Sequence, residues 1–459
     1  MAIYLILYII VTFAARNVAV LGLCNDGIRK TMAQQAYLNG LMSFISDSPT
    51  PFHAVASMER QLNLAGYNQL YVADTWHLEL GGRYFITRND STIVAFQLPQ
   101  ENAIQRMHMV GAHTDSPCLK VKPNPEIQCK GYQQLGVEVY GGALLHPWFD
   151  RDLSLAGRVV CRDANNKLVS HLIDFKRPIA CIPSLAIHLD REANKEHSVN
   201  PQTDLPVLLG QALGDDFSLR RVLADELKAN GHQVDQVIDY ELSFYDVQAP
   251  ALVGLKEEFL AAARLDNLLS CYIGLTALLA AQTDQGMLLI CHDHEEVGSQ
   301  SAEGAQGGFL MSVLQRILPT AELLHQVLDA STFISADNAH GVHPNFTNKH
   351  DEQHGPKLNQ GPVIKVNANQ RYATNAVTSA MIKELAAQMD LPIQTFVVRS
   401  DMACGSTIGP ITAAALGVRT LDLGVPTFAM HSIRELAGSA DAQITHNLLQ
   451  KFFETEMVV

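Results

Sequence analysis

"LDNLLSCYIGLTALLAA" (265–281), followed by "MLLIC" (287–291), decides the architecture of this chain of 459 residues. The first stretch is apolar on nearly all sides, which is typical of a buried helix. The second is a short apolar run bounded by polar residues, which predicts a buried strand. The helix-then-strand order recurs downstream at 307–336, 375–398 and 407–424. This alternation predicts an α/β fold, with a mixed, mostly parallel sheet flanked by helices on both faces.

Upstream of that region the pattern of predicted strands and helices changes twice. "RMHMVGAHTD" (106–115) predicts another buried strand that stops at His113. Between about 117 and 255, alternating strands, turn-rich links such as "DANNK" and one amphipathic helix replace the α/β pattern. We therefore expect residues 32–116 and 256–459 to form one domain, into which residues 117–255 are inserted as a second, β-rich domain.

The first 31 residues do not fit either pattern. Residues 3–15 are uncharged and mostly apolar, but they are short for a membrane span, which needs about 20 residues, and no basic segment precedes them. Met32 opens an ordinary amphipathic helix. We expect Met32 to be the natural start and residues 1–31 to be an apolar extension that arises from start-site choice. The alternative is a membrane anchor.

Charge and cysteine usage exclude several functions. The formal net charge is −14, which argues against nucleic-acid binding and against stable association with anionic membranes. The eight cysteines are scattered without a CxxC pair, so they predict neither a disulfide framework nor a cysteine metal knuckle. A cytoplasmic protein in a reducing compartment is the simplest interpretation.

Metal-capable side chains gather where the predicted strands end. In doubly wound sheets, ligands bind at the carboxyl ends of the strands. Imidazole and carboxylate ligands without cysteine suit a pair of divalent ions such as zinc, cobalt or manganese, and not a structural zinc. The candidates are His113, Asp115, Asp266, Glu295, Glu296, Asp337 and His431.

Other metal motifs are weaker. "HEEVG" carries Gly298 where the second histidine of a mononuclear HExxH site would stand. "HDEQH" (350–354) lies in a stretch rich in Gly, Pro and Asn, where helical pairing is not expected. "HSIRE" could pair His431 with Glu435 on a helix, and this remains a less favoured alternative.

A family resemblance adds to this interpretation. From about Met32 to the C-terminus, the chain resembles the aspartyl aminopeptidase family of dinuclear zinc metallopeptidases. The motifs that carry the resemblance, in chain order, are "VGAHTDSPCLKVKPNP", "YGGALLHPWFDRDLSLAGRV", "IPSLAIHLDR", "ARLDNL", "HDHEEVGSQSAEGA", "SADNAHGVHPNF", "GPVIKVNANQRYATNA", "CGSTIGPI" and "LDLGVPTFAMHSIRE".

The resemblance implies a set of metal ligands. One ion would be held by His113 and Asp337, and the other by Glu296 and His431. Asp266 would bridge the two. The ions would be zinc, with cobalt or manganese as alternatives.

It also implies catalytic roles. Asp115 would orient the imidazole of His113 and raise its basicity. Glu295 would be the general base for a metal-activated hydroxide that attacks the peptide carbonyl. If the backbone is extended here, Glu295 and Glu296 point apart, so that one serves the water and the other the metal.

The resemblance extends to His188 and Lys365. His188, in "SLAIHLDR", would reach the active site of a neighbouring subunit and stabilise the oxyanion; a further metal ligand and a structural histidine are the alternatives. Lys365 would pair with an acidic first side chain of the substrate, and Arg371 lies near it in the chain.

The expected function is a dinuclear metalloaminopeptidase that removes N-terminal Asp or Glu from peptides with a free N-terminus. A broad or neutral-preferring aminopeptidase, a deacylase or carboxypeptidase on the same metal scaffold, and a non-catalytic assembly protein are the alternatives. The resemblance further implies a homo-oligomer, a dodecamer built through the inserted domain.

Overall fold

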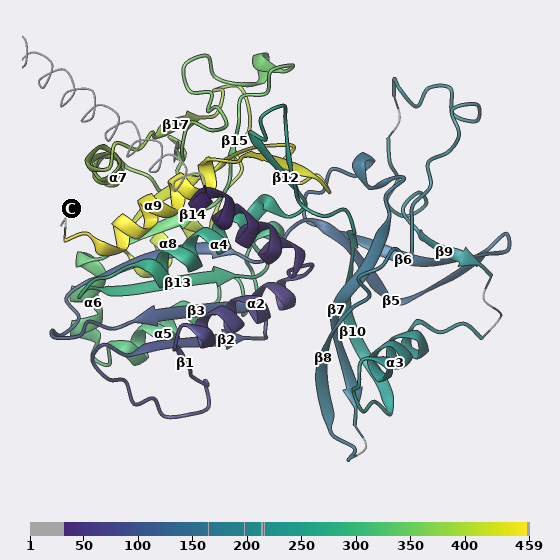
Figure 1. The fold of residues 1–459 in the computed structure, drawn as a ribbon, viewed down its shortest axis with the longest axis horizontal. Coiled ribbons are helices and arrows are strands. Elements are labelled where there is room, and N and C mark those ends of the chain that lie inside the picture. The colour runs from purple at the N-terminus through teal and green to yellow at the C-terminus, as the bar shows by residue number, and fades with distance from the viewer. Residues whose placement is uncertain (1–31, 164, 197, 213, 215, 457–459) are drawn as a thin grey trace, which may run out of the picture.

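The fold was analysed in a computed structural model, which describes residues 32–456 apart from 164, 197, 213 and 215 (Figure 1). The predictions for residues 1–31 lie outside the described residues. Among the described helices, none combines the length and the apolar character that crossing a membrane requires.

A nine-stranded sheet forms the centre of the larger unit, in the order β1-β2-β3-β13-β4-β14-β18-β16-β17. Strands β13, β4, β14 and β18 run parallel, whereas β3 and β16 flank them in the antiparallel sense. The predicted mixed, mostly parallel sheet is therefore confirmed. The strands are β1 (Asn68–Gln69), β2 (Arg83–Arg88), β3 (Thr92–Gln97), β4 (Met107–His113), β13 (Gly286–His292), β14 (Thr332–Ala336), β16 (Val363–Val366), β17 (Gln394–Val397) and β18 (Arg419–Gly424).

Helices cover both faces of this sheet because its central strands are apolar on both sides. On β4, Val110 and Ala112 join one core cluster, and Met107 and Met109 join the other. The first cluster packs against residues 32–46, α2 (Pro51–Leu64), α4 (Leu265–Ala280), α7 (Ala376–Gln388) and α9 (Asp441–Glu454). The second packs against α5 (Phe309–Ile317), α6 (Ala321–Ala330) and α8 (Ile408–Leu416).

A six-stranded antiparallel sheet, ordered β8-β7-β10-β5-β6-β9, stands beside this unit (Figure 1). It has its own core, which includes Leu223 and Leu227 of α3 (Leu219–Ala229). The strands are β5 (Cys118–Cys129), β6 (Tyr132–Tyr140), β7 (Leu153–Arg162), β8 (Leu168–Asp174), β9 (Val207–Gln211) and β10 (Gln236–Asp246). We call residues 118–246 the β-rich unit.

A third sheet of five strands, ordered β11-β12-β20-β19-β15, lies at the strand ends of the large sheet. Its strand β11 falls inside the range predicted for the insertion but pairs with β12. The strands are β11 (Ala251–Val253), β12 (Phe259–Ala262), β15 (Ala339–His340), β19 (Pro426–Phe428) and β20 (Glu435–Gly438). Three short 3-10 helices complete the described elements: η1 (His146–Trp148), η2 (Glu295–Val297) and η3 (Thr347–Lys349).

Candidate metal centre

The register of two adjacent parallel strands brings His113 and Asp337 together. Ser335 of β14 pairs with Gly111 of β4, so two residues further along stand Asp337 and His113. The Nε2 atom of His113 lies 3.7 Å from Oδ1 of Asp337 and 3.5 Å from Oδ1 of Asp266. All three residues are buried. We call His113, Asp266 and Asp337 the inner position.

A second group shares Asp266 with the first. The Nε2 atom of His431 lies 3.5 Å from Oδ2 of Asp266 and 3.5 Å from Oε1 of Glu296. The two carboxylate oxygens of Asp266 thus face different histidines. His431 is the most open member, because 31% of its side chain is exposed against 2% for His113. We call Asp266, Glu296 and His431 the outer position.

The residues present fit divalent ions such as zinc. Oδ1 of Asp266 and Oε1 of Glu296 are buried and accept no hydrogen bond from the described residues. The distances between imidazole and carboxylate atoms, 3.5–3.7 Å, are too long for hydrogen bonds. They approach the roughly 3.3 Å that separates two ligands around a tetrahedral zinc with bonds of about 2.0 Å. Each group places its ligand atoms within 4.8 Å of one another.

The charges in the centre also call for a cation. Burial, followed by the negative charge of Asp266, raises the pKa of Glu296 to about 9, against the lowering effect of His113 and His431. Burial lowers the pKa of His113, but the carboxylates of Asp115, Asp266 and Asp337 outweigh burial and hold it well above its ordinary value. The centre therefore carries an excess of negative charge, which a divalent ion would balance.

Backbone carbonyls fix which nitrogen of each histidine faces the centre. Nδ1 of His113 donates to the carbonyl of Asp115 at 3.1 Å and lies 3.3 Å from its carboxylate. Nδ1 of His431 donates to the carbonyl of Gly142 at 3.1 Å. In both residues Nε2 is left to face the carboxylates, as a metal ligand requires.

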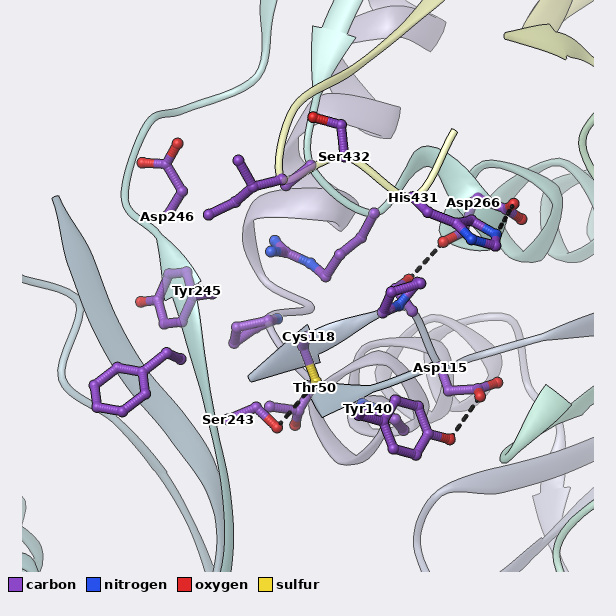
Figure 2. A pocket seen from close by; sticks show the side chains of 18 of the residues that line it. Thr50, Asp115, Cys118, Tyr140, Ser243, Tyr245, Asp246, Asp266, His431 and Ser432 are labelled. Atoms are coloured by element: carbon purple, nitrogen blue, oxygen red, sulfur yellow. Dashed lines mark hydrogen bonds and ion pairs between the residues drawn. The ribbon is translucent and has the colours of Figure 1, made fainter. Parts of the chain in front are cut away.

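Asp115 is a buried hub that joins several parts of the centre. Its carboxylate accepts the backbone N–H of Glu295 at 3.1 Å and that of Glu296 at 3.0 Å. It also accepts the hydroxyl of Tyr140, from β6 of the β-rich unit, at 2.7 Å (Figure 2). Asp115 thus holds both the imidazole of His113 and the turn that carries the two glutamates.

The adjacent glutamates lie on the 3-10 helix η2, and the expected extended backbone is wrong at this point. His294 before the turn and Gly298 after it both have positive φ, which closes the backbone into one tight turn. Oε2 of Glu295 lies 4.0 Å from Nε2 of His113, and its side chain is 16% exposed. Burial raises the pKa of Glu295 to about 7, against the lowering effect of His113, and the charges of Asp337 and Asp115 add to the rise.

The centre opens into a cavity of about 630 Å³, which Arg371 and Lys365 also line. The ammonium of Lys365 is buried and donates to Oδ2 of Asp337 at 3.1 Å and to the carbonyl of Asn338 at 3.0 Å. The sequence did not indicate this contact with a candidate ligand. Arg371 is exposed.

His188 lies apart from this centre. It is exposed, on the segment between β8 and β9. Within the described part of the chain, it neither lines the cavity nor joins a metal-capable group. Its neighbours Leu185, Ile187 and Leu189 are exposed by 60%, 46% and 75%.

Two contributors were missed from sequence. Tyr140 begins one of the motifs that carry the resemblance, but nothing in the sequence assigned it a role, because a tyrosine at the end of a strand is ordinary. Glu435 was considered only as a metal partner of His431 on a helix, which is wrong: His431 lies in a turn at φ 68°, and Glu435 begins β20. The carboxylate of Glu435 instead accepts the backbone N–H groups of Asp266 and His431.

Comparison with known families places this protein in the class of zinc metalloproteases. The family described as "Aminopeptidase I zinc metalloprotease (M18)" matches residues 44–453. The chain belongs to this family, and it is a metalloaminopeptidase that hydrolyses peptide bonds.

Individual relatives and solved structures agree with this family assignment. A "Probable M18 family aminopeptidase 2" from Pseudomonas savastanoi pv. phaseolicola is 58% identical over 418 residues, which is 90% of this chain and 97% of the relative. The structure titled "Cryo-EM structure of the Ape4 and Nbr1 complex" superposes with a TM-score of 0.89 at 39% identity, covering 92% of this chain and 86% of that one. The S. cerevisiae structure described as an "mApe1 dodecamer" gives 0.79 at 28% identity, covering 92% and 97%.

Proposed function

We propose that the chain is a two-metal aminopeptidase that removes N-terminal Asp and Glu residues from peptides. The observation that carries this proposal is the pair of groups that share Asp266, with one histidine facing each of its oxygens. Asp266 would bridge two ions, with His113 and Asp337 on the inner one and Glu296 and His431 on the outer. Zinc fits the donor set, and cobalt or manganese are the alternatives.

When bound, two divalent cations would polarise the scissile carbonyl and acidify the attacking water. The chain's own residues do the rest. Glu295, at the edge of the cavity, takes a proton from the attacking water and returns it to the departing amine. Asp115 supports this role, because it fixes the backbone of Glu295 through a hydrogen bond of 3.1 Å.

Selectivity for acidic residues would come from Lys365 and Arg371. Lys365 already donates to Asp337 and Asn338, which leaves one of its three N–H bonds for a substrate carboxylate. Arg371 lines the same cavity and is exposed. Because the chain as a whole is acidic, at −14, long-range attraction would not recruit acidic peptides. A local ion pair is therefore needed.

The test is hydrolysis of chromogenic amides of Asp, Glu and Leu, run together with metal analysis. We expect two metal ions per chain and a preference for Asp and Glu of about tenfold or more, the size of one net ion pair of about 1.4 kcal/mol. Lys365→Ala and Arg371→Ala, measured separately, assign the selective cation. Equal rates on Asp and Leu amides would establish the broad-specificity alternative. Cleavage of acylated or C-terminal substrates alone would establish the deacylase or carboxypeptidase alternative.

We further propose that the predicted insertion, 117–255, serves self-assembly and that His188 acts in a neighbouring subunit. The exposed apolar side chains around His188 are of the kind that an interface buries. The S. cerevisiae structure to which this chain is similar is described as a dodecamer, which supports self-assembly.

Mixed oligomers test this role of His188. His188→Ala chains keep Glu295, and Glu295→Gln chains keep His188, so each is inactive alone. When the two are reassembled together, we expect partial recovery of activity, because a His188→Ala site can receive His188 from its neighbour. Recovery that does not exceed that of either variant alone would refute a role in trans.

We also propose a cytoplasmic location, because the described cysteines are free and Cys161, Cys271 and Cys291 are buried without bridging. Cell fractionation checks this directly, and recovery of the enzyme in an oxidising compartment would contradict it.

A further inference from the structure

A buried carboxylate outside the ligand set ties together two parts of the centre. Glu435 is only 2% exposed. Its Oε2 accepts the backbone N–H of Asp266 at 3.0 Å, and its Oε1 accepts that of His431 at 2.8 Å. Both carboxylate oxygens are therefore engaged by the main chain of residues assigned to the outer position.

Neither of those residues is held in place by regular secondary structure. Asp266 lies at the start of α4, where its φ of −86° and ψ of 105° depart from helical values. His431 lies between β19 and β20 with φ 68°, a left-handed conformation that is uncommon for residues other than glycine and lies outside regular helix and strand geometry. The separation between these two backbones consequently depends on hydrogen bonds to other segments, and those to Glu435 join the two directly.

A glutamate is suited to holding two backbone N–H groups, and its burial is unfavourable unless it does so. Burying a carboxylate is unfavourable unless hydrogen bonds satisfy it. An ionised carboxylate offers two acceptor oxygens, so it can take both N–H groups at once. A carboxamide offers one acceptor oxygen, and its NH₂ group would face the second N–H donor.

We propose that Glu435 is a positioning residue that sets the distance between Asp266 and His431 and thereby the affinity of the outer position. It acts through these two ligands and contacts neither ion nor substrate. This inference rests on the ligand set of the proposed function. It replaces the interpretation of "HSIRE" as a pair of metal ligands, because the oxygens of Glu435 are taken up by backbone N–H groups.

The chain provides a matched control in Asp441. This carboxylate is also fully buried, and it accepts two backbone N–H groups, from Asn359 at 2.6 Å and from Gly361 at 2.8 Å. It belongs to none of the metal-capable groups among the described residues and does not line the cavity. Asp441→Asn therefore disturbs the fold in the same way without reaching the centre.

The test is zinc titration of the metal-free protein against a competing chelator, for wild type, Glu435→Gln and Asp441→Asn. We expect Glu435→Gln to weaken the second equivalent of zinc by roughly 10- to 100-fold, the usual cost of losing an outer-shell partner, and to leave the first nearly unchanged. Asp441→Asn should lower the melting temperature but leave both zinc affinities as in wild type.

Substitution with cobalt adds a readout that a purely structural role would not change. The absorption bands of the second cobalt should shift in Glu435→Gln and not in Asp441→Asn. If Glu435→Gln does not fold, Glu435→Asp carries the test, since it keeps both oxygens but withdraws them by one methylene, and it should weaken the second zinc in the same direction.

The outcomes separate this inference from the proposed function. If wild type binds two zinc ions and Glu435→Gln binds both with wild-type affinity, the inference fails and the proposed function stands. If wild type binds fewer than two, the two-metal proposal itself fails. Equal loss of zinc affinity in Glu435→Gln and Asp441→Asn would also overturn the inference, because the effect would then be general.

Discussion

The inner and outer positions are built in different ways, although they share Asp266. His113 and Asp337 stand at the ends of adjacent parallel strands, and pairing in the middle of the large sheet determines where they meet. Glu296 and His431 stand on a 3-10 turn and on a loop with a left-handed residue. The sheet therefore sets one half of the centre, and loops set the other.

The outer position depends on supports from several segments for this reason. Asp115 holds the backbone of Glu296, and Glu435 holds that of His431. Gly142 of the β-rich unit accepts the ring N–H of His431, and Leu144 donates to the carbonyl of that residue at 3.0 Å. We infer that the outer position is the more easily perturbed of the two.

Removing the shared ligand should have the largest effect. Asp266→Asn takes negative charge from both positions, so we expect loss of both metals and a fall in kcat/KM of roughly 10³-fold or more, beyond the roughly 10- to 100-fold cost of losing an outer-shell partner. Metal analysis after gel filtration, with amide hydrolysis, checks this. Asp441→Asn serves as the control for folding. If Asp266→Asn kept both metals, Asp266 would not be the ligand that the inner and outer positions share.

The two histidines should then separate the positions. His431→Ala is expected to leave one tightly held zinc per chain, because the inner ligands remain buried in the sheet. His113→Ala removes a buried side chain, so it should also lower the free energy of unfolding by about 1–3 kcal/mol. Zinc titration and urea unfolding of both variants measure these differences.

Chelation of the wild-type enzyme tests the difference between the inner and outer positions without a mutation. We expect zinc to leave in two steps as chelator concentration rises, and the first step to be absent in His431→Ala. A single step that removes both ions together would contradict the separate release of the two ions that we expect.

The difference between the positions also explains what sequence could predict. The helix-then-strand alternation predicted the α/β sheet, and apolar strands that stop at His113, Cys291 and Ala336 marked the edge where ligands gather. Strand ends are local features of the pattern, so the sequence could place His113 and Asp337 at this edge, whereas their assignment to one ion came from the family resemblance. The bounds of the β-rich insertion stay a prediction.

The outer position could not be derived in this way. The backbone at the adjacent glutamates was expected to be extended, but it forms a 3-10 helix. Backbone N–H groups of this helix donate to Asp115, which lies 180 residues away in sequence. The hydrogen bonds of Tyr140 with Asp115 and of Glu435 with Asp266 also join segments that are not neighbours in sequence, through common residue types. Such hydrogen bonds leave no periodic signal. The strand ends placed Glu296 and His431 among the candidates, but only the family resemblance assigned them to the same ion.

Tyr140→Phe tests the influence of the β-rich unit on the centre. It removes the hydroxyl that donates to Asp115 at 2.7 Å but keeps the ring, which packs under the ammonium of Lys120 at 4.0 Å. We expect the lost hydrogen bond to Asp115 to cost about 1–2 kcal/mol, which would appear as a roughly 5- to 30-fold weaker affinity for the second zinc. Competitive zinc titration measures it.

Tyr245→Phe is the matched control. Its hydroxyl also donates to a carboxylate of the β-rich unit, Asp174, at 2.6 Å. It should cost similar stability without changing zinc affinity. Equal zinc affinities in Tyr140→Phe and Tyr245→Phe would show that the β-rich unit does not act on the centre through Asp115.

The smallest expected effect concerns the strand that carries the inner position. His108 lies on β4, is 3% exposed and packs edge-on against Phe452. Burial lowers the pKa of His108 to about 4, and the charge of Arg106 contributes. The unfolded chain, with an ordinary histidine pKa of about 6.5, binds the proton more readily than the folded chain. Stability should therefore be lost as pH falls from about 6.5 towards about 4.

His108→Leu removes this term and keeps an apolar side chain in the core. Urea unfolding of the metal-free protein at pH 7 and pH 5 measures how far the free energy of unfolding falls between these two pH values. We expect this decrease to be smaller in His108→Leu than in wild type by on the order of 1–2 kcal/mol. The exposed His77→Leu is the control and should behave as wild type. Because β4 ends at His113, acid would then weaken the inner position through the fold of its strand, in addition to any competition of protons for the ligands. An unchanged pH dependence in His108→Leu would mean that the sheet contributes no acid sensitivity at this position.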